Sequence, residues 1–262
     1  MIDRVESGYS IRQQYTGFST IRSTGLHRIR AITIDLDDTL WEIGPVIRRA
    51  EADLWSWLEQ NYPRIPEAFP PDVSAALREQ VVKDHPDRMH DFRFLRKAVL
   101  TAMALKTGYH ADFVEEAFAV FDAGRNKVSL FPDVMPVLQE LSQHFRVVAL
   151  TNGNANLETI GIRECFHSVI TAVDAGAAKP ASIIFEKAVQ ATGVAPNEVV
   201  HVGDHPEIDI VGAIDAGLRT AWMNRTDAIW PEHLPAPDAT ITTITELREL
   251  LGDALAGMND AP

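Results

Sequence analysis

The chain has 262 residues, of which 46% are hydrophobic and 23% charged, and its formal net charge at pH 7 is −13. This length and composition are typical of a globular protein built as one large domain or as a domain with an insertion. The negative charge argues against non-specific binding to nucleic acid or anionic membranes, and the single cysteine, Cys165, excludes an intramolecular disulfide framework.

Residues 1–28 are predicted to form an N-terminal extension of low order, because they are polar and lack the apolar stretch of a secretory signal. No run of about 18 apolar residues predicts a transmembrane helix anywhere in the chain. We therefore expect a cytoplasmic protein that has no membrane or nucleic-acid partner and is a monomer or a homodimer.

From residue 31 onward, short apolar runs alternate with helical patterns. Residues 133–144 carry apolar side chains at the spacing of one helix face, and two further helices are predicted to begin at Pro180 and Pro206. Such alternation predicts an α/β fold, with a Rossmann-like, mostly parallel sheet covered on both faces by helices. The predicted strands are 31–34, 147–150, 168–171, 198–202 and 219–223.

The interval between the first two predicted strands spans about 105 residues, which is more than a crossover connection needs. Within it, residues 46–60, 91–106 and 111–122 each show an apolar face at helical spacing. The prediction is an inserted helical cap domain over residues 44–128 and a core domain made of residues 29–43 and 129–262.

Polar residues cluster where the predicted core strands end, and parallel strands bring these ends to one edge of the sheet. Carboxylates without histidine or cysteine partners are hard ligands suited to Mg²⁺, whereas a lysine and free backbone N–H groups favour a phosphate. One carboxylate can attack phosphorus as a nucleophile, and a second can act as general acid and base. The candidate residues are Asp35, Asp37, Thr151, Asn152, Lys179, Asp204 and Asp209.

Four segments resemble, in order, the four motifs of the haloacid dehalogenase-like (HAD) hydrolases. They are IDLDDTL (34–40), LTNGN (150–154), AKP (178–180) and VGDHPEIDIVGA (202–213). The resemblance covers residues 31 to about 223, with a helical insertion where the C1-type cap of that family belongs. It implies the HAD fold and, as the leading activity, a Mg²⁺-dependent phosphatase.

The resemblance implies a separate role for each acidic residue. Asp35 corresponds to the nucleophile and a Mg²⁺ ligand, and Asp37 corresponds to the general acid/base, whose backbone carbonyl typically binds the metal. Asp204 corresponds to a direct metal ligand, and Asp209 to a partner of the metal or of the lysine. Asp38 receives no catalytic role and is expected to form hydrogen bonds within its loop.

The same resemblance places the phosphate among three further residues. Thr151 and the Asn152 amide correspond to the phosphate-binding second motif, and Lys179 corresponds to the lysine that neutralises the nucleophile and the phosphate. His205 stands where the family often has serine, and it is more simply interpreted as a surface loop residue.

Several residues of the predicted cap and its linkers are open to two interpretations. Arg93, Arg96 and Lys97 lie on one face of a predicted helix and could contact an anionic substrate or form an ordinary solvated face. Trp41 and Arg125 stand where the chain leaves and re-enters the core, and they could line the site or serve only packing and surface roles.

The substrate is predicted from a weaker resemblance. The segments DLDDTLW, RFLRKA and HVGD resemble the bacterial phosphatases acting on 5-amino-6-(5-phospho-D-ribitylamino)uracil and FMN in riboflavin biosynthesis. Phosphoglycolate, other sugar phosphates and nucleotide monophosphates are the alternative substrates.

Other functions share part of this motif set. A phosphomutase uses the same residues, and a 2-haloacid dehalogenase uses the nucleophile without needing Asp37. A response-regulator receiver is smaller, lacks the insertion and orders its lysine after its acids. A degenerate HAD-fold binding protein is the remaining non-enzymatic alternative, and the intact motifs argue against it.

Overall fold

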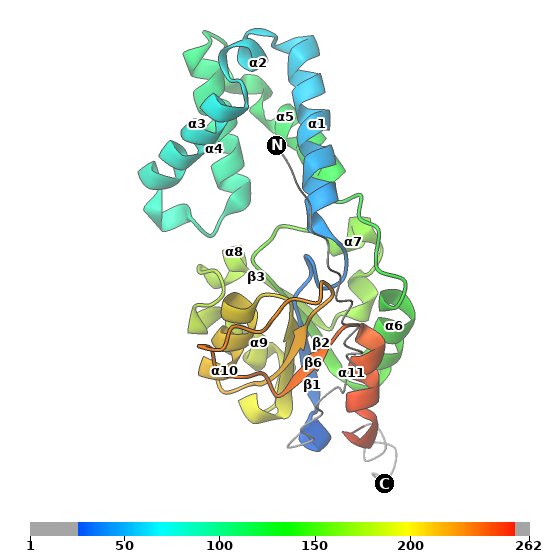
Figure 1. Cartoon of the computed structure of the whole chain (residues 1–262). Helices are drawn as coiled ribbons and strands as arrows, with labels where there is room; N and C mark the ends of the chain where they lie inside the picture. Colours follow the sequence, from blue (N-terminus) through cyan, green and yellow to red (C-terminus); the bar gives the residue numbers. More distant parts are fainter. Residues whose placement is uncertain (1–25, 255–262) are drawn as a thin grey trace, which may run out of the picture.

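The computed structural model describes residues 26–254 of the chain. It shows an α/β core and, at one end of it, a group of helices joined to the core by two linkers (Figure 1). None of the helices within residues 26–254 is long and apolar enough to cross a membrane.

The core contains a six-stranded sheet in which every neighbouring pair is parallel, in the order β3-β2-β1-β4-β5-β6. The chain builds the sheet outward from β1, first towards β3 and then towards β6, so the order reverses at β1. Ligands of such sheets bind at this switch point, outside the carboxyl ends of the strands. The strands are β1 Ala31–Ile34, β2 Arg146–Thr151, β3 Ser168–Thr171, β4 Val199–Gly203, β5 Arg219–Met223 and β6 Ala239–Ile241.

Helices cover both faces of the sheet, and side chains alternate between the two faces along each strand. On β2, Val147 and Ala149 pack into the cluster that contains helices α6 and α11, whereas Val148 and Leu150 pack against helix α9. Figure 1 shows α6 and α11 on one side of the sheet and α9 and α10 on the other. These helices are α6 Val134–His144, α9 Ser182–Thr192, α10 Gly212–Asp215 and α11 Ile244–Leu250.

The short elements of the core connect these layers. They are η1 Leu26–Arg28, α7 Leu157–Ile160, η4 Arg163–Cys165, α8 Ala172–Ala175, η5 Pro196–Glu198 and the π-helical turn η6 Pro206–Val211. The helix predicted from Pro206 is therefore divided into η6 and α10, and the one predicted from Pro180 begins at Ser182. All five predicted strands are present, and β6 is an additional strand of 3 residues, too short to show a periodic pattern.

The helical insertion, defined here as residues 43–125 between β1 and β2, has a hydrophobic cluster of its own, distinct from the two that cover the sheet. The three helices predicted in this interval are present, and α2 and α3 are additional. Helix α3 buries only Ser74 and Val81, which explains why its sequence lacks a strong apolar face. The elements are α1 Ile43–Asn61, α2 Arg64–Ala68, α3 Pro71–Asp84, η2 Pro86–Arg88, α4 Phe92–Lys106, η3 Ala111–Phe113 and α5 Val114–Arg125.

Candidate active site

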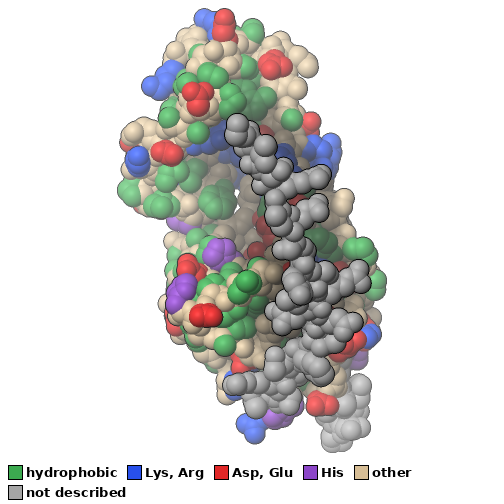
Figure 2. Space-filling view, viewed as in Figure 1, with side chains coloured by type: hydrophobic (Ala, Val, Ile, Leu, Met, Phe, Trp, Pro, Cys, Tyr) green, Lys and Arg blue, Asp and Glu red, His purple; other side chains and the backbone are tan. Residues whose placement is uncertain are grey.

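A cavity of about 530 Å³ lies between the carboxyl ends of the core strands and the helical insertion. The hollow between these two parts of the molecule is visible in Figure 2. The insertion contributes a mostly apolar wall, with residues such as Leu54, Val99 and Phe121. The core contributes all seven residues predicted for the site, namely Asp35, Asp37, Thr151, Asn152, Lys179, Asp204 and Asp209.

Asp35 follows β1 directly, and its backbone N–H continues the sheet by donating to Val202 at 2.9 Å. The side chain forms an ion pair with Lys179, whose Nζ also donates to the Leu150 carbonyl at 3.0 Å. Burial, together with the nearby charge of Asp209, raises the pKa of Asp35 well above its usual range despite the lysine. Additional positive charge beside Asp35 would favour the ionised form of this carboxylate.

Asp209 is the second partner of Lys179, at 2.6 Å, and its side chain is only 2% exposed. Its other oxygen accepts the His205 backbone N–H at 3.0 Å, and buried His201 lies 3.4 Å from the first. Burial opposes ionisation of Asp209, but the charge of Lys179 outweighs it and holds the pKa of Asp209 below its usual range. Gly203 makes this packing possible, since a Cβ there would lie 2.4 Å from the Asp209 Cγ.

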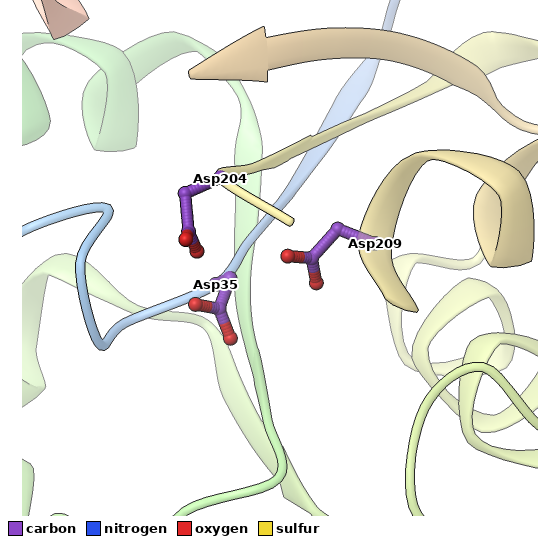
Figure 3. Close-up of side chains that lie close together, drawn as sticks. All are labelled: Asp35, Asp204 and Asp209. Carbon is purple, nitrogen blue, oxygen red and sulfur yellow. The ribbon is translucent and has the colours of Figure 1, made fainter. Parts of the chain in front are cut away.

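Asp35 follows β1, Asp204 follows β4 and Asp209 lies in η6, and their side chains point toward one another (Figure 3). Their carboxylate oxygens include a set in which every pair lies within 4.8 Å. Burial and the charges of Asp209 and Asp38 raise the pKa of Asp204 to about 7. Three crowded carboxylates form an oxygen-rich donor set that fits a hard divalent cation, whose charge would reduce their mutual repulsion.

The loop after β2 is ordered by its own side chains. The Thr151 hydroxyl accepts the Gly153 N–H at 2.9 Å. The Asn152 side chain binds both backbone groups of Lys179, accepting its N–H at 2.7 Å and donating to its carbonyl at 3.1 Å. This clamp fixes the segment that carries the lysine.

Asp37 lies between the core and the helical insertion. It accepts the indole N–H of Trp41 at 2.9 Å and pairs with Arg125 at 2.8 Å. Burial raises the pKa of Asp37, while Arg125 and the Trp41 hydrogen bond act in the opposite direction. Both Trp41 and Arg125 were open to a purely structural interpretation, and the structure places both against the predicted acid/base.

Two neighbouring residues have local structural roles. The Asp38 carboxylate accepts the N–H of Ile43, the first residue of α1, at 2.9 Å, and its φ of 59° places it in the left-handed region. The expectation that Asp38 forms hydrogen bonds within its loop is thus met by the structure. The exposed His205 ring caps η6 by accepting the N–H groups of Glu207 and Ile208, each at 3.2 Å.

Of the three basic residues predicted on α4, Arg96 lines the cavity. Its guanidinium pairs with Glu51 at 2.8 Å and lies 3.4 Å above the ring of Phe121. Arg93 pairs instead with Asp122 at 3.5 Å and is half exposed, and Lys97 pairs with Glu115 at 2.6 Å. The helical spacing did not separate these three side chains, because which of them meets the cavity depends on how α4 packs.

The fold and this cluster of strand-end aspartates around a buried lysine define a hydrolase of the α/β class. A family model for the haloacid dehalogenase-like hydrolases matches residues 29–217. The chain belongs to this family, and the predicted HAD fold is confirmed.

Named relatives and a solved structure agree with this assignment. The chain is 30% identical to the Escherichia coli 5-amino-6-(5-phospho-D-ribitylamino)uracil phosphatase YigB, over 86% of this chain and 98% of that protein. It is 28% identical to human N-acylneuraminate-9-phosphatase, over 87% and 95%. A crystal structure of a 2-haloacid dehalogenase from Pseudomonas syringae pv. Tomato DC3000 superimposes with a TM-score of 0.82, at 36% identity over 86% and 98%. The family match and the two phosphatase relatives confirm the prediction of a phosphoric monoester hydrolase.

Proposed function

We propose that this hydrolase is a Mg²⁺-dependent phosphatase that cleaves a small phosphorylated metabolite through an aspartyl-phosphate on Asp35. The observation that carries the proposal is that two carboxylates, two residues apart in the sequence, line the same cavity and have different partners. Asp35 contacts buried Lys179, and Asp37 contacts Trp41 and Arg125. Their different partners suit one carboxylate to nucleophilic attack and the other to proton transfer.

In the first step, a carboxylate oxygen of Asp35 bonds to phosphorus while the bond from phosphorus to the leaving oxygen breaks. Asp37 gives its proton to that oxygen, and the alcohol leaves. In the second step, water attacks phosphorus and gives a proton to Asp37, and the bond between phosphorus and Asp35 breaks. Inorganic phosphate leaves, and both aspartates return to their starting states.

Lys179 and the loop after β2 are proposed to hold the phosphoryl group. The Lys179 ammonium sits beside the nucleophile, and its pKa is raised because Asp209 and Asp35 outweigh the effect of burial. It therefore remains charged throughout the physiological pH range. The Thr151 hydroxyl and the backbone amide of Asn152 are the proposed phosphate donors, since the Asn152 side chain is already bound to Lys179.

The side chains of Asp35 and Asp204 and the backbone carbonyl of Asp37 are the proposed Mg²⁺ ligands, with Asp209 as a neighbouring partner. The three clustered carboxylates fit such an ion by their donor chemistry. When bound, Mg²⁺ would offset the negative charge of the carboxylates and of the phosphoryl group.

For the substrate, we propose 5-amino-6-(5-phospho-D-ribitylamino)uracil or FMN, placing the chain in riboflavin biosynthesis. The similarity to YigB over nearly its whole length supports this choice. The largely apolar wall of the insertion, with Phe121 and Leu54, also suits a leaving group that carries a flat ring. We propose that residues 44–128, which contain nearly all of the insertion, act as the cap domain, and that residues 29–43 and 129–262 form the core.

Dehalogenation is the second candidate, because the similar solved structure from Pseudomonas syringae is named a 2-haloacid dehalogenase. In that reaction Asp35 would attack carbon and displace a halide, and no acid would be needed for the leaving group. The ordered environment of Asp37 favours the phosphatase, since Trp41 and Arg125 hold a second carboxylate at the cavity.

The deciding experiment measures phosphate release from p-nitrophenyl phosphate, the flavin precursor, FMN, phosphoglycolate and sugar phosphates, with Mg²⁺ and with EDTA, beside chloride release from 2-chloropropionate. The proposal predicts Mg²⁺-dependent phosphate release, with the highest kcat/KM for a flavin-type ester. Chloride release without phosphatase activity would overturn it, and highest efficiency on phosphoglycolate would overturn the substrate assignment alone.

A further inference from the structure

The two linkers between the core and the helical insertion meet at the carboxylate of Asp37. Trp41 lies two residues before α1, and its Nε1 donates to Oδ1 of Asp37 at 2.9 Å. Arg125 is the last residue of α5, and its Nη2 donates to both Oδ1 and Oδ2 at 2.8 Å. Within residues 26–254, both hydrogen-bond partners of this side chain therefore lie at the junctions between the insertion and the core.

Arg125 is held in an environment that stability alone does not explain. Its side chain is 2% exposed, and its Nη1 has no hydrogen-bond partner within residues 26–254. In that part of the chain, Asp37 is the acid with which it forms an ion pair. A buried guanidinium with an unsatisfied nitrogen costs folding free energy, and buried ion pairs of this kind are weak sources of stability.

The pair also packs against the proposed phosphate loop. A Cβ at Gly153 would lie 2.8 Å from Oδ2 of Asp37, 3.2 Å from Nη2 of Arg125 and 3.2 Å from the Thr151 hydroxyl. The backbone at Gly153 thus lies against one side of the Asp37 carboxylate, and Arg125 lies against another. The rotation that a free aspartate side chain would have is restricted by these contacts on two sides.

We propose that Arg125 is a positioning residue that holds the Asp37 carboxylate toward the leaving-group oxygen. The proposal rests on the phosphatase function above. From the described residues, Oδ1 accepts two hydrogen bonds and Oδ2 accepts one, which leaves a lone pair of Oδ2 to carry the transferred proton. A general acid works only within hydrogen-bond reach of its target. Loss of the hydrogen bonds from Arg125 to Asp37 should therefore reduce proton transfer to the leaving oxygen.

This role makes a prediction that a merely structural arginine does not. Protonation of the leaving oxygen matters greatly for an alkyl phosphate, whose alkoxide is a poor leaving group, and little for p-nitrophenyl phosphate. The ratio kcat/KM covers the steps up to formation of the phosphorylated Asp35, and it therefore isolates departure of the leaving group from later hydrolysis. Mispositioning of Asp37 should lower kcat/KM mainly for alkyl phosphates, whereas partial unfolding should lower kcat/KM equally for the alkyl phosphate and for p-nitrophenyl phosphate.

The test compares Arg125→Met, Arg125→Lys, Asp37→Asn and the double variant Arg125→Met/Asp37→Asn, with Arg93→Met as the matched cap arginine outside the cavity. We expect Arg125→Met to lower kcat/KM for an alkyl phosphate at least about tenfold more than for p-nitrophenyl phosphate. Arg125→Lys, which keeps the charge, should show the same selectivity with a smaller loss. Arg93→Met should change neither value.

In the Asp37→Asn background, Arg125→Met should cause no further loss on the alkyl ester, because the arginine acts through the missing carboxylate. Equal losses on both esters, or additive losses in the double variant, would overturn the inference. If Arg125→Met does not fold, the ester selectivity of Arg125→Lys decides. If the wild-type protein releases no phosphate, or if its phosphate release does not depend on Asp35, the proposed function itself is contradicted. The inference about Arg125 then fails with it.

Discussion

The Nζ atom of Lys179 donates to Oδ1 of Asp209 at 2.6 Å, and both side chains are only 2% exposed. The same ammonium pairs with Asp35, so a single buried positive charge is shared by two buried carboxylates. Removing one partner of a buried ion pair leaves the other charge uncompensated. Lys179 is therefore important for folding as well as for the proposed catalysis.

Replacement of Lys179 by Met should lower the free energy of unfolding by roughly 3–5 kcal/mol at neutral pH, because two buried carboxylates lose their cation. Phosphatase activity should fall to background. Denaturant unfolding followed by circular dichroism measures the first effect. Lys187→Met is the control, since the partly exposed Lys187 donates to the backbone carbonyl of Asp174 and forms no carboxylate ion pair within residues 26–254. Equal stability of the two variants would contradict the interpretation.

Metal affinity should depend on pH through Asp204, whose pKa burial raises to about 7. Above that pH the carboxyl group is ionised and can bind a cation, and below it a proton must first be displaced. The dissociation constant for Mg²⁺ should therefore rise by about tenfold for each pH unit below 7. Calorimetric titration at pH 6 and pH 8 measures it, and equal affinities would argue against Asp204 as a ligand.

The same raised pKa predicts a stability effect in the metal-free protein. An acid whose pKa is higher in the folded state than in the unfolded state binds more protons when folded, between its unfolded value of 3.8 and about 7. Its contribution to stability therefore falls as pH rises through this window. In EDTA at pH 8, Asp204→Asn should melt at a higher temperature than the wild type, while its Mg²⁺-dependent activity is lost. A lower Tm for Asp204→Asn than for the wild type would contradict the interpretation that the charge of Asp204 is repelled by the neighbouring carboxylates.

Substrate selection by the insertion can be tested on two arginines of α4. Arg96 lines the cavity beside Phe121, whereas Arg93 is half exposed and pairs with Asp122. Arg96→Ala should lower kcat/KM for the preferred ester about tenfold or more and affect p-nitrophenyl phosphate much less. Arg93→Ala is the matched control and should leave both values near wild type. A loss confined to Arg93→Ala would show that the cavity-facing side of α4 has been assigned wrongly.

The sequence was sufficient to predict that the site residues converge. Each follows a strand or precedes a helix, and parallel strands bring such positions to one edge of the sheet. Asp35 and Asp204 thus meet in the structure although 168 residues separate Ile34 of β1 from its register partner Val202 of β4. The short strand β6 and the weakly apolar helix α3 were missed because neither carries a periodic pattern long enough to identify.

The partners of Asp37 were beyond what the sequence could reveal. Arg125 ends a helix and Trp41 precedes another, and neither has a spacing relationship to Asp37 that indicates a hydrogen bond. Their contacts depend on how the two linkers run side by side, as shown by the bridge between Trp41 and Leu130. The clamp of Asn152 on the Lys179 backbone was hidden for the same reason, because loop packing leaves no periodic trace.

The most direct test of the account is kcat for phosphate release from p-nitrophenyl phosphate by Asp35→Asn, measured with Mg²⁺ beside the wild type. The amide has nearly the same shape as the carboxylate but cannot form the aspartyl-phosphate. The proposed mechanism predicts a variant that is folded by circular dichroism and whose kcat is lowered by at least about a thousandfold. A folded Asp35→Asn protein that keeps most of the wild-type kcat would contradict the nucleophile on which the proposed function depends.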